Sequence, residues 1–254
     1  MSRIIISFGF VLSSLIPACA SSSVVDELAG ESTDDDAVSD AGKADGVDGA
    51  YTYFAITHDS RRCASPMCGG YFLARVNRTT TVCHDGRANA SCYTPVLDWS
   101  ETELGADAQD LLVGAASRGA TGTYGVLGLV RGRFLARNDT VRPELGRFVV
   151  SEAWVADGTG VSDGVFARVK DTGVRCIAAP CPSLLERALN ESRSAMIAGV
   201  DYTDAGLTDA QIEDLNAALF EPSGIIVAGD RYTIHESGRT AKGRTATQAY
   251  HRLR

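Results

Sequence analysis

The chain has 254 residues and a formal net charge of −8 at neutral pH. That length allows one large domain or two small ones. Nine acidic residues against one lysine lie between residues 20 and 50, so residues 51–254 are close to neutral. No nucleic-acid partner is expected, because such binding needs clustered positive charge.

The first residues have the features of a bacterial signal peptide. A positive start at Arg3 precedes an apolar run over 4–16, which is too short to span a bilayer. The run ends in Ile16-Pro17-Ala18-Cys19, which resembles a lipobox. We therefore predict a signal peptide over 1–18, lipidation of Cys19 and a membrane partner through this N-terminal lipid anchor. The alternative is ordinary cleavage after residue 20, which would give a soluble periplasmic or secreted protein.

Residues 19–50 are predicted to be a disordered acidic linker. They are mostly Ser, Asp, Gly and Ala, with almost no large apolar side chains to bury. Repulsion between the acids keeps such a tether extended. By resemblance to bacterial lipoproteins, Ala20 after Cys19 implies sorting to the outer membrane or cell surface.

Seven cysteines suggest a disulfide framework plus one lipidated residue. Removing Cys19 leaves an even number, as expected in an oxidising compartment. The spacing favours three local pairs, and a pairing between the two halves of the chain stays open. A zinc site formed by Cys63, Cys68, Cys83 and Cys92 is disfavoured, because Cys83 and Cys92 lie too far apart in sequence for paired zinc ligands. The disulfide candidates are Cys63, Cys68, Cys83, Cys92, Cys176 and Cys181.

The first half of the folded part contains a strand–helix–strand pattern. It begins with Leu97-Asp98-Trp99-Ser100 and continues into strands expected over 126–134 and 148–155. Between Ser100 and the first of these strands we predict a helix from its apolar spacing. The apolar residues of that helix are Leu104, Ala108, Leu111, Leu112 and Ala115.

The segment Arg175 to Pro182 is short, contains two prolines and is expected to be closed by Cys176 and Cys181. A rigid loop of this kind could dock in a protease cleft, because preorganisation lowers the cost of binding. The favoured account is a turn leading into a helix over 183–190, with Ser183 as cap and Glu186 three residues on.

The second half repeats the pattern of the first. Val200-Asp201-Tyr202-Thr203 precedes a helix capped by Thr208 with Gln211, a capping box. An apolar stripe and a β-branched strand over 225–227 follow. The basic residues 239–254 favour a solvated edge strand rather than an anion-binding patch. The stripe residues are Ile212, Leu215 and Leu219.

These matched patterns predict an internal duplication. The fold expected is α+β, with two related units of antiparallel strands over 51–146 and 147–254, each with a packed helix, and with disulfide-supported loops. The alternative is two ordinary strand–helix–strand units that share a common pattern.

No catalytic constellation is apparent. Cys83-His84-Asp85 is better explained as a loop, and His58 and His251 as sheet residues. Asp98 and Asp201 are expected to cap or complement the helices that follow. Glu152 lies in a strand without an obvious partner. Asn77, Asn89, Asn138 and Asn190 each head an Asn-x-Ser/Thr triplet, which in a chain with a bacterial lipobox is a chance match and not a glycosylation site. We assign no catalytic, cofactor-binding or metal-binding residues and expect no cofactor.

The stretches Arg175 to Ser183, Val200 to Tyr202 and Gly224 to Gly229 resemble an uncharacterised domain family. That family occurs in exported lipoproteins of myxobacteria and related bacteria, and the resemblance implies no activity. We expect a lipid-anchored envelope protein that acts as a non-enzymatic binding or structural module, with an unidentified extracellular or periplasmic protein partner. The alternatives are a protease-inhibitor-like protein acting through the Cys176–Cys181 loop, or an unrecognised hydrolase.

Overall fold

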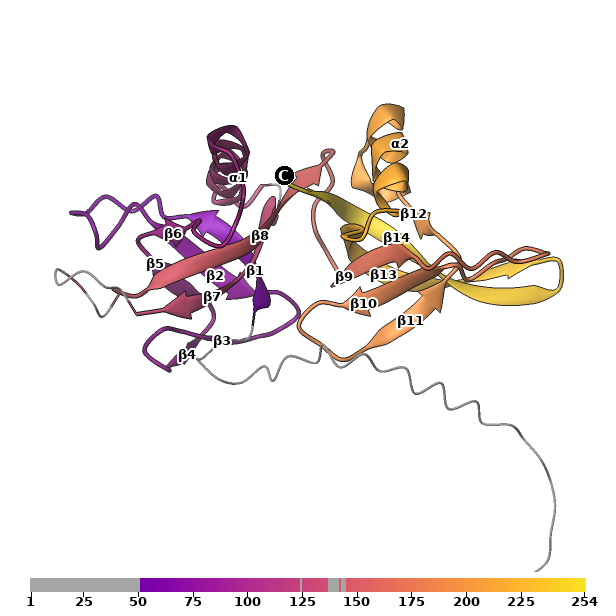
Figure 1. Ribbon diagram of the computed structural model, residues 1–254, viewed down its shortest axis with the longest axis horizontal. Coiled ribbons are helices and arrows are strands. Elements are labelled where there is room, and N and C mark those ends of the chain that lie inside the picture. Colours follow the sequence, from indigo (N-terminus) through magenta and orange to yellow (C-terminus); the bar gives the residue numbers. More distant parts are fainter. Residues whose placement is uncertain (1–50, 124, 137–141, 143–144) are drawn as a thin grey trace, which may run out of the picture. The chain divides into compact units, whose positions relative to one another are not determined.

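The computed structural model describes residues 51–123, 125–136, 142 and 145–254. The predicted signal peptide over 1–18, the lipidation site Cys19 and the acidic linker over 19–50 lie outside these residues. The described part is a mostly antiparallel sheet with two α-helices and three disulfides, an arrangement of the α+β kind (Figure 1). In chain order the elements are β1 (Thr52–His58), β2 (Tyr71–Arg75), β3 (Thr81–Val82), β4 (Ala88–Asn89), β5 (Cys92–Thr94), β6 (Leu97–Asp98), α1 (Ala106–Gly119), β7 (Gly128–Leu135), β8 (Arg147–Asp157), β9 (Val165–Asp171), β10 (Leu184–Ala188), β11 (Ser194–Ile197), β12 (Val200–Asp201), the 3-10 turn η2 (Thr203–Ala205), α2 (Asp209–Ala218), β13 (Ile225–Glu236) and β14 (Arg239–Arg252).

One large sheet runs through the described residues. Its strand order is β11-β10-β9-β13-β14-β8-β7-β1-β2-β5, with antiparallel neighbours along this path. Two short strands pair in parallel beside it, β6 with β8 and β12 with β14. The strands β3 and β4 form a separate ribbon. The β14–β8 pair thus stands at the middle of the order, with similar connections on either side. We call β1 to β8 with α1 the first half, and β9 to β14 with α2 the second half.

The central pair has a symmetric register. Arg252 of β14 faces Trp154 of β8, and Tyr250 of β14 faces Ala156 of β8. Exchanging the two strands therefore brings Trp154 onto Tyr250 and leaves the pairing unchanged.

Each half has a β-bulge at the corresponding place. The register between β7 and β8 shifts before Gly132, and that between β13 and β14 shifts before Gly229. A side chain at either glycine would collide with a carbonyl of the neighbouring strand. The extra residue is Ser151 in β8 and Thr247 in β14, and its hydroxyl donates to the carbonyl before the glycine (3.1 and 3.2 Å). The two hairpins are therefore bent by the same device.

Two asparagines connect the halves reciprocally. Asn190 accepts a hydrogen bond from the backbone N–H of Tyr53 in β1 (2.9 Å) and donates to the carbonyl of Tyr53 and to that of the residue before Asn77 (2.7 and 3.0 Å). Asn77 does the same for Phe166 in β9 and for the residue before Asn190 (2.9, 2.7 and 2.9 Å). Both asparagines have a left-handed backbone, with φ of 57° and 58°. Each half thus supplies a side chain that satisfies backbone hydrogen-bonding groups of the other half.

Both helices lie on one face of the sheet (Figure 1). Leu112 and Ala115 of α1 are fully buried against the first half, and Leu215 of α2 is buried against the second. On the opposite face a third core gathers around Trp154 and Tyr250 of the two central strands. The halves therefore have a core each and share one between them. In the described part, no helix is long and apolar enough to cross a membrane.

The helix prediction for the second half is confirmed. Thr208 and Gln211 form the capping box: the Thr208 hydroxyl accepts from the Gln211 N–H, and the Gln211 amide oxygen accepts from the Thr208 N–H. Leu215 and Leu219 are buried as expected. Leu111 of α1 departs from its predicted stripe and is 58% exposed, because the buried stripe runs along the neighbouring side of the helix.

Two local predictions are wrong. Residues 183–190, expected as a helix, contain the strand β10, whose inward residues Leu184, Glu186 and Ala188 recur at a period of two. Hydrogen bonds from β9 and β11 on either side outweigh the local helix signal. The last strand, β14, is central rather than an edge strand, because it pairs with β13 on one side and with β8 and β12 on the other. Its Arg244 is buried in an ion pair with Glu186.

Candidate functional site

The six cysteines of the described part form the three local disulfides that the spacing favoured. Cys83 is therefore not a free thiol, which removes it as a nucleophile or metal ligand in the oxidised protein. Among the described residues, no three His, Cys, Asp or Glu side chains are grouped to hold a metal ion. The pairs are Cys63–Cys68, Cys83–Cys92 and Cys176–Cys181, with Cα–Cα distances of 5.5, 5.3 and 5.5 Å.

The histidines singled out from the sequence lie apart from one another. His58 packs edge-to-face on Tyr71, with ring centroids 5.7 Å apart. His251, in the central strand β14, has its Nδ1 2.8 Å from a carboxylate oxygen of Asp157. The hydrogen bond with Asp157 raises the pKa of His251.

Glu152 has the partner that the sequence did not supply. It lies largely buried on β8, where Arg131 donates to it from β7 (2.9 Å). Burial alone would raise the pKa of Glu152, but the positive charges of Arg131, Arg168 and Arg252 lower it. Tyr53 also donates to this carboxylate (3.2 Å), and burial raises the pKa of Tyr53 to about 12. Near neutral pH the carboxylate stays ionised and the phenol protonated, so neither group exchanges protons readily.

Asp98 and Asp201 stabilise two matched turns and do not cap the α-helices that follow. Asp98 accepts from the backbone N–H of Ser100 (2.9 Å), and Asp201 accepts from that of Thr203 (3.0 Å). Hydrogen bonds with Ser100 lower the pKa of Asp98, and those with Thr203 lower the pKa of Asp201. The α-helices begin later, after Gly105 and Thr208, so neither carboxylate reaches the N-terminus of α1 or α2.

The Cys176–Cys181 loop projects from the hairpin of β9 and β10. Ile177 within it is fully exposed, with a relative exposure of 108%. Beside the loop, Val174 and Phe220 are 46% and 67% exposed. A shallow cavity of about 490 Å³ lies between the loop and the end of α2, lined by both of these side chains. Apolar groups exposed together in this way are typical of a contact surface.

Charged contacts hold the base of this loop. Arg175 forms an ion pair with Asp171 (3.1 Å) and donates to the carbonyl of Val174 (2.7 Å). Its guanidinium also lies 5.8 Å from the centre of the Phe220 ring. The corresponding loop of the first half is held similarly, with Arg61 paired to the buried Asp59 (2.9 Å). Each loop is thus joined to its own hairpin by an Asp–Arg pair.

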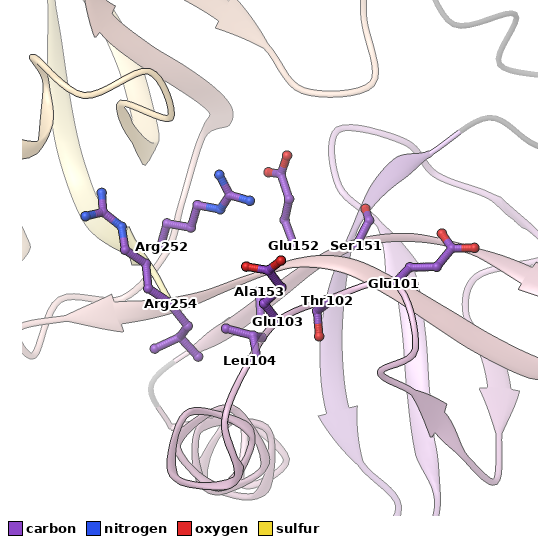
Figure 2. Close-up of a pocket in the computed structure, with 10 residues that line it drawn as sticks. Glu101, Thr102, Glu103, Leu104, Ser151, Glu152, Ala153, Arg252 and Arg254 are labelled. Atoms are coloured by element: carbon purple, nitrogen blue, oxygen red, sulfur yellow. The ribbon is translucent and has the colours of Figure 1, made fainter.

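A second cavity, of about 580 Å³, opens beside β8 (Figure 2). The loop before α1 lines one side, with Glu101 and Glu103 among its residues. The end of β14 lines another with Arg252 and Arg254, and Glu152 of β8 lies between the two. Glu101 forms an ion pair with Arg133 outside the cavity (2.7 Å). The cavity therefore has acidic and basic walls.

Residues 52–254 match the family profile described as "Domain of unknown function (DUF6748)". No curated protein and no solved structure matches the chain. The matched region runs from the first residue of β1 through β14, so it takes in both halves. The expected membership of an uncharacterised domain family is confirmed, and the link to myxobacterial lipoproteins stays a prediction. The chain belongs to the DUF6748 family, whose shared domain has no assigned function.

Proposed function

We propose that this protein is a lipid-anchored cell-envelope protein that acts as a non-enzymatic binding module and contacts a protein partner through the Cys176–Cys181 loop. The observation that carries this is the full exposure of Ile177 on a disulfide-closed loop. Water-exposed Ile, Val and Phe side chains gain free energy when a partner covers them. Because the loop is held by the disulfide and by the Arg175–Asp171 pair, little of that gain is spent on ordering it.

Site-specific photo-cross-linking in the producing organism tests the contact. A photoreactive phenylalanine analogue replaces Ile177 in one variant and Val161 in the other. Val161 is also apolar and 53% exposed, but it lies away from the loop, so it is a matched control. We expect a discrete adduct from position 177 and none from position 161. Equal labelling from both positions, or none from 177, would rule out the loop as the contact surface.

A protease-inhibitor-like role is the second candidate, and the exposure of Ile177 favours it. The Cα atoms of Cys176 and Cys181 are only 5.5 Å apart, whereas the same residues fully extended would span about 16 Å. The loop would therefore enter a protease as a compact, closed segment that presents the exposed Ile177. Titration of serine proteases that accept aliphatic side chains tests this: inhibition that is lost in Ile177→Asp supports it, and an unaffected protease counts against it.

The lipid anchor on Cys19 is part of the same proposal. It is supported by the lipobox-like Ile16 to Cys19, and the envelope setting fits the resemblance to exported lipoproteins of myxobacteria and related bacteria. The intact mass of the membrane-extracted protein provides the test. We expect a diacyl or triacyl adduct on Cys19 and a gain of six hydrogens on reduction of the three disulfides. A chain that starts at Ser21 without an adduct would contradict the anchor.

We further propose that the two halves arose by duplication. The reciprocal asparagines, the matched bulges and the symmetric β14–β8 register support this. The boundary predicted at residues 146 and 147 separates β8 from β7, although β8 pairs with β7 and β6. A boundary after Asp157 keeps each set of paired strands together.

A further inference from the structure

The 580 Å³ cavity lies at a gap along one edge of β8. On that edge β6 pairs with β8 up to Val149, and β14 pairs with it from Trp154 onward. The bulge residue Ser151 and its neighbour Glu152 lie between these two pairings and line the cavity. Figure 2 shows the residues of β8, the end of β14 and the loop before α1 around this space.

The corresponding gap in the second half is filled by the protein's own main chain. After β8 ends, Thr159 donates its N–H to the carbonyl of Gly206 (3.2 Å), and Gly160 donates to the carbonyl of Ala205 (3.0 Å). A side chain at Gly160 would collide with the carbonyl of the bulge residue Thr247. A segment with small residues therefore lies against the bulge and the turn after β12.

The acceptors of this segment have counterparts in the first half. Thr102 follows Asp98 at the spacing at which Ala205 follows Asp201. The two turns also have the same internal hydrogen bond. The N–H of Thr102 donates to the carbonyl of Trp99, and the N–H of Ala205 donates to the carbonyl of Tyr202 (both 3.0 Å). Thr102 and the next residue, Glu103, thus stand where Ala205 and Gly206 stand in the second half.

In the described residues of the first half, these acceptors have no donor. Among the described residues, none donates a hydrogen bond to the carbonyl of Thr102 or of Glu103. By the symmetry of the central pair, Arg254 takes the position of Gly158. The cavity is lined by Thr102, Glu103 and Ser151, the counterparts of the three residues that surround Thr159 and Gly160 in the second half.

We propose that this cavity binds an extended segment of a partner polypeptide with small side chains. Two successive N–H groups of the segment would donate to the carbonyls of Thr102 and Glu103, as Thr159 and Gly160 do in the other half. Such main-chain recognition beside a strand edge is an established mode of peptide binding. The site is separate from the Cys176–Cys181 loop, so it stands or falls independently of the proposed function.

The probe for this site is a capped peptide with the chain's own sequence over 157–162, Asp-Gly-Thr-Gly-Val-Ser. It is titrated into the isotope-labelled protein while backbone amide shifts are recorded. We expect saturable shifts at the amides around Ser151 and Thr102. A matched peptide N-methylated at the threonine and the second glycine lacks the two donors and should bind at least about tenfold more weakly.

Two protein variants complete the test. Glu103→Trp places a bulky side chain in the cavity, and the Glu103 side chain is exposed, so the change removes no buried contact. Asp110→Trp makes the same kind of change on the exposed side of α1, outside the cavity. We expect binding to be lost in Glu103→Trp and kept in Asp110→Trp. Failure of the plain peptide to bind, equal affinity for the N-methylated peptide, or binding that survives Glu103→Trp would overturn the proposal.

Discussion

Asn77 and Asn190 perform a task that few other side chains could. Each donates to two carbonyls and accepts from one N–H of the other half. A side-chain amide provides both kinds of group within a few ångströms. Asparagine also tolerates the left-handed backbone found at both positions better than most residues with a Cβ.

Replacing Asn190 with alanine should therefore weaken the fold as a whole. Asn190→Ala removes three hydrogen bonds to part-buried backbone groups, and it keeps a Cβ in a left-handed conformation. We expect the free energy of unfolding to fall by about 2–4 kcal/mol, measured by urea denaturation. Asn77→Ala should give a similar loss.

Two controls separate the causes of this loss. Asn190→Gly removes the same hydrogen bonds but relieves the backbone, so it should be about 1 kcal/mol more stable than Asn190→Ala. Asn89→Ala alters an exposed asparagine of β4 and should change stability little. If Asn190→Ala were no worse than Asn89→Ala, the reciprocal contact would not contribute to stability.

At the level of the elements, the central strands β8 and β14 carry a pH-sensitive pair. The hydrogen bond and charge of Asp157, with the charge of Asp214 on α2, raise the pKa of His251 in the fold, although burial opposes this. A raised folded-state pKa means that the stabilisation is fully present below the unfolded pKa, about 6.5, and is lost as the pH rises through the folded value.

We therefore expect thermal stability to fall between about pH 6 and pH 8, and Asp157→Asn to reduce that dependence. Differential scanning calorimetry across this range provides the measurement. His235→Asn, at an exposed position of β13, is the control and should leave the dependence unchanged. A profile that is the same with and without Asp157 would contradict the assignment.

The elements differ in how far the sequence alone predicts them. The capping box of α2 and the strand after it are predicted because their signals are local, lying within a few residues of one another. The segment 183–190 carries a similar Ser-x-x-Glu signal, yet it forms β10. There Glu186 is buried against Arg244, a residue far along the chain. Pairing of that kind leaves no local pattern.

The candidate site residues are likewise predictable from the sequence only where their partners lie close by in the chain. The disulfides are predictable, because the paired cysteines lie close together in sequence. The roles of Asn77 and Asn190 are not, since each depends on a loop of the other half. The exposed Phe220 beside the Cys176–Cys181 loop is likewise evident only once α2 and the hairpin of β9 and β10 are placed.

For the whole described part, the shared core around Trp154 and Tyr250 predicts cooperative unfolding. Side chains of both halves meet there, and the asparagines join the same face. We expect a single thermal transition whose calorimetric and van't Hoff enthalpies agree. In the double variant Asn77→Ala/Asn190→Ala the transition should move to lower temperature without splitting. Two separate transitions in the unaltered protein would show that the halves fold independently.

The symmetric pairing of β8 with β14 has a further consequence. A strand edge that pairs with its own counterpart in this way is what a subunit of a twofold dimer presents, an isologous contact. The duplication that we propose would join two such subunits into one polypeptide, which makes their association independent of protein concentration. It also frees the copies to diverge: residues 158–160 lie against the bulge of one copy, whereas the corresponding place beside β8 in the other is the cavity that we propose as a peptide site.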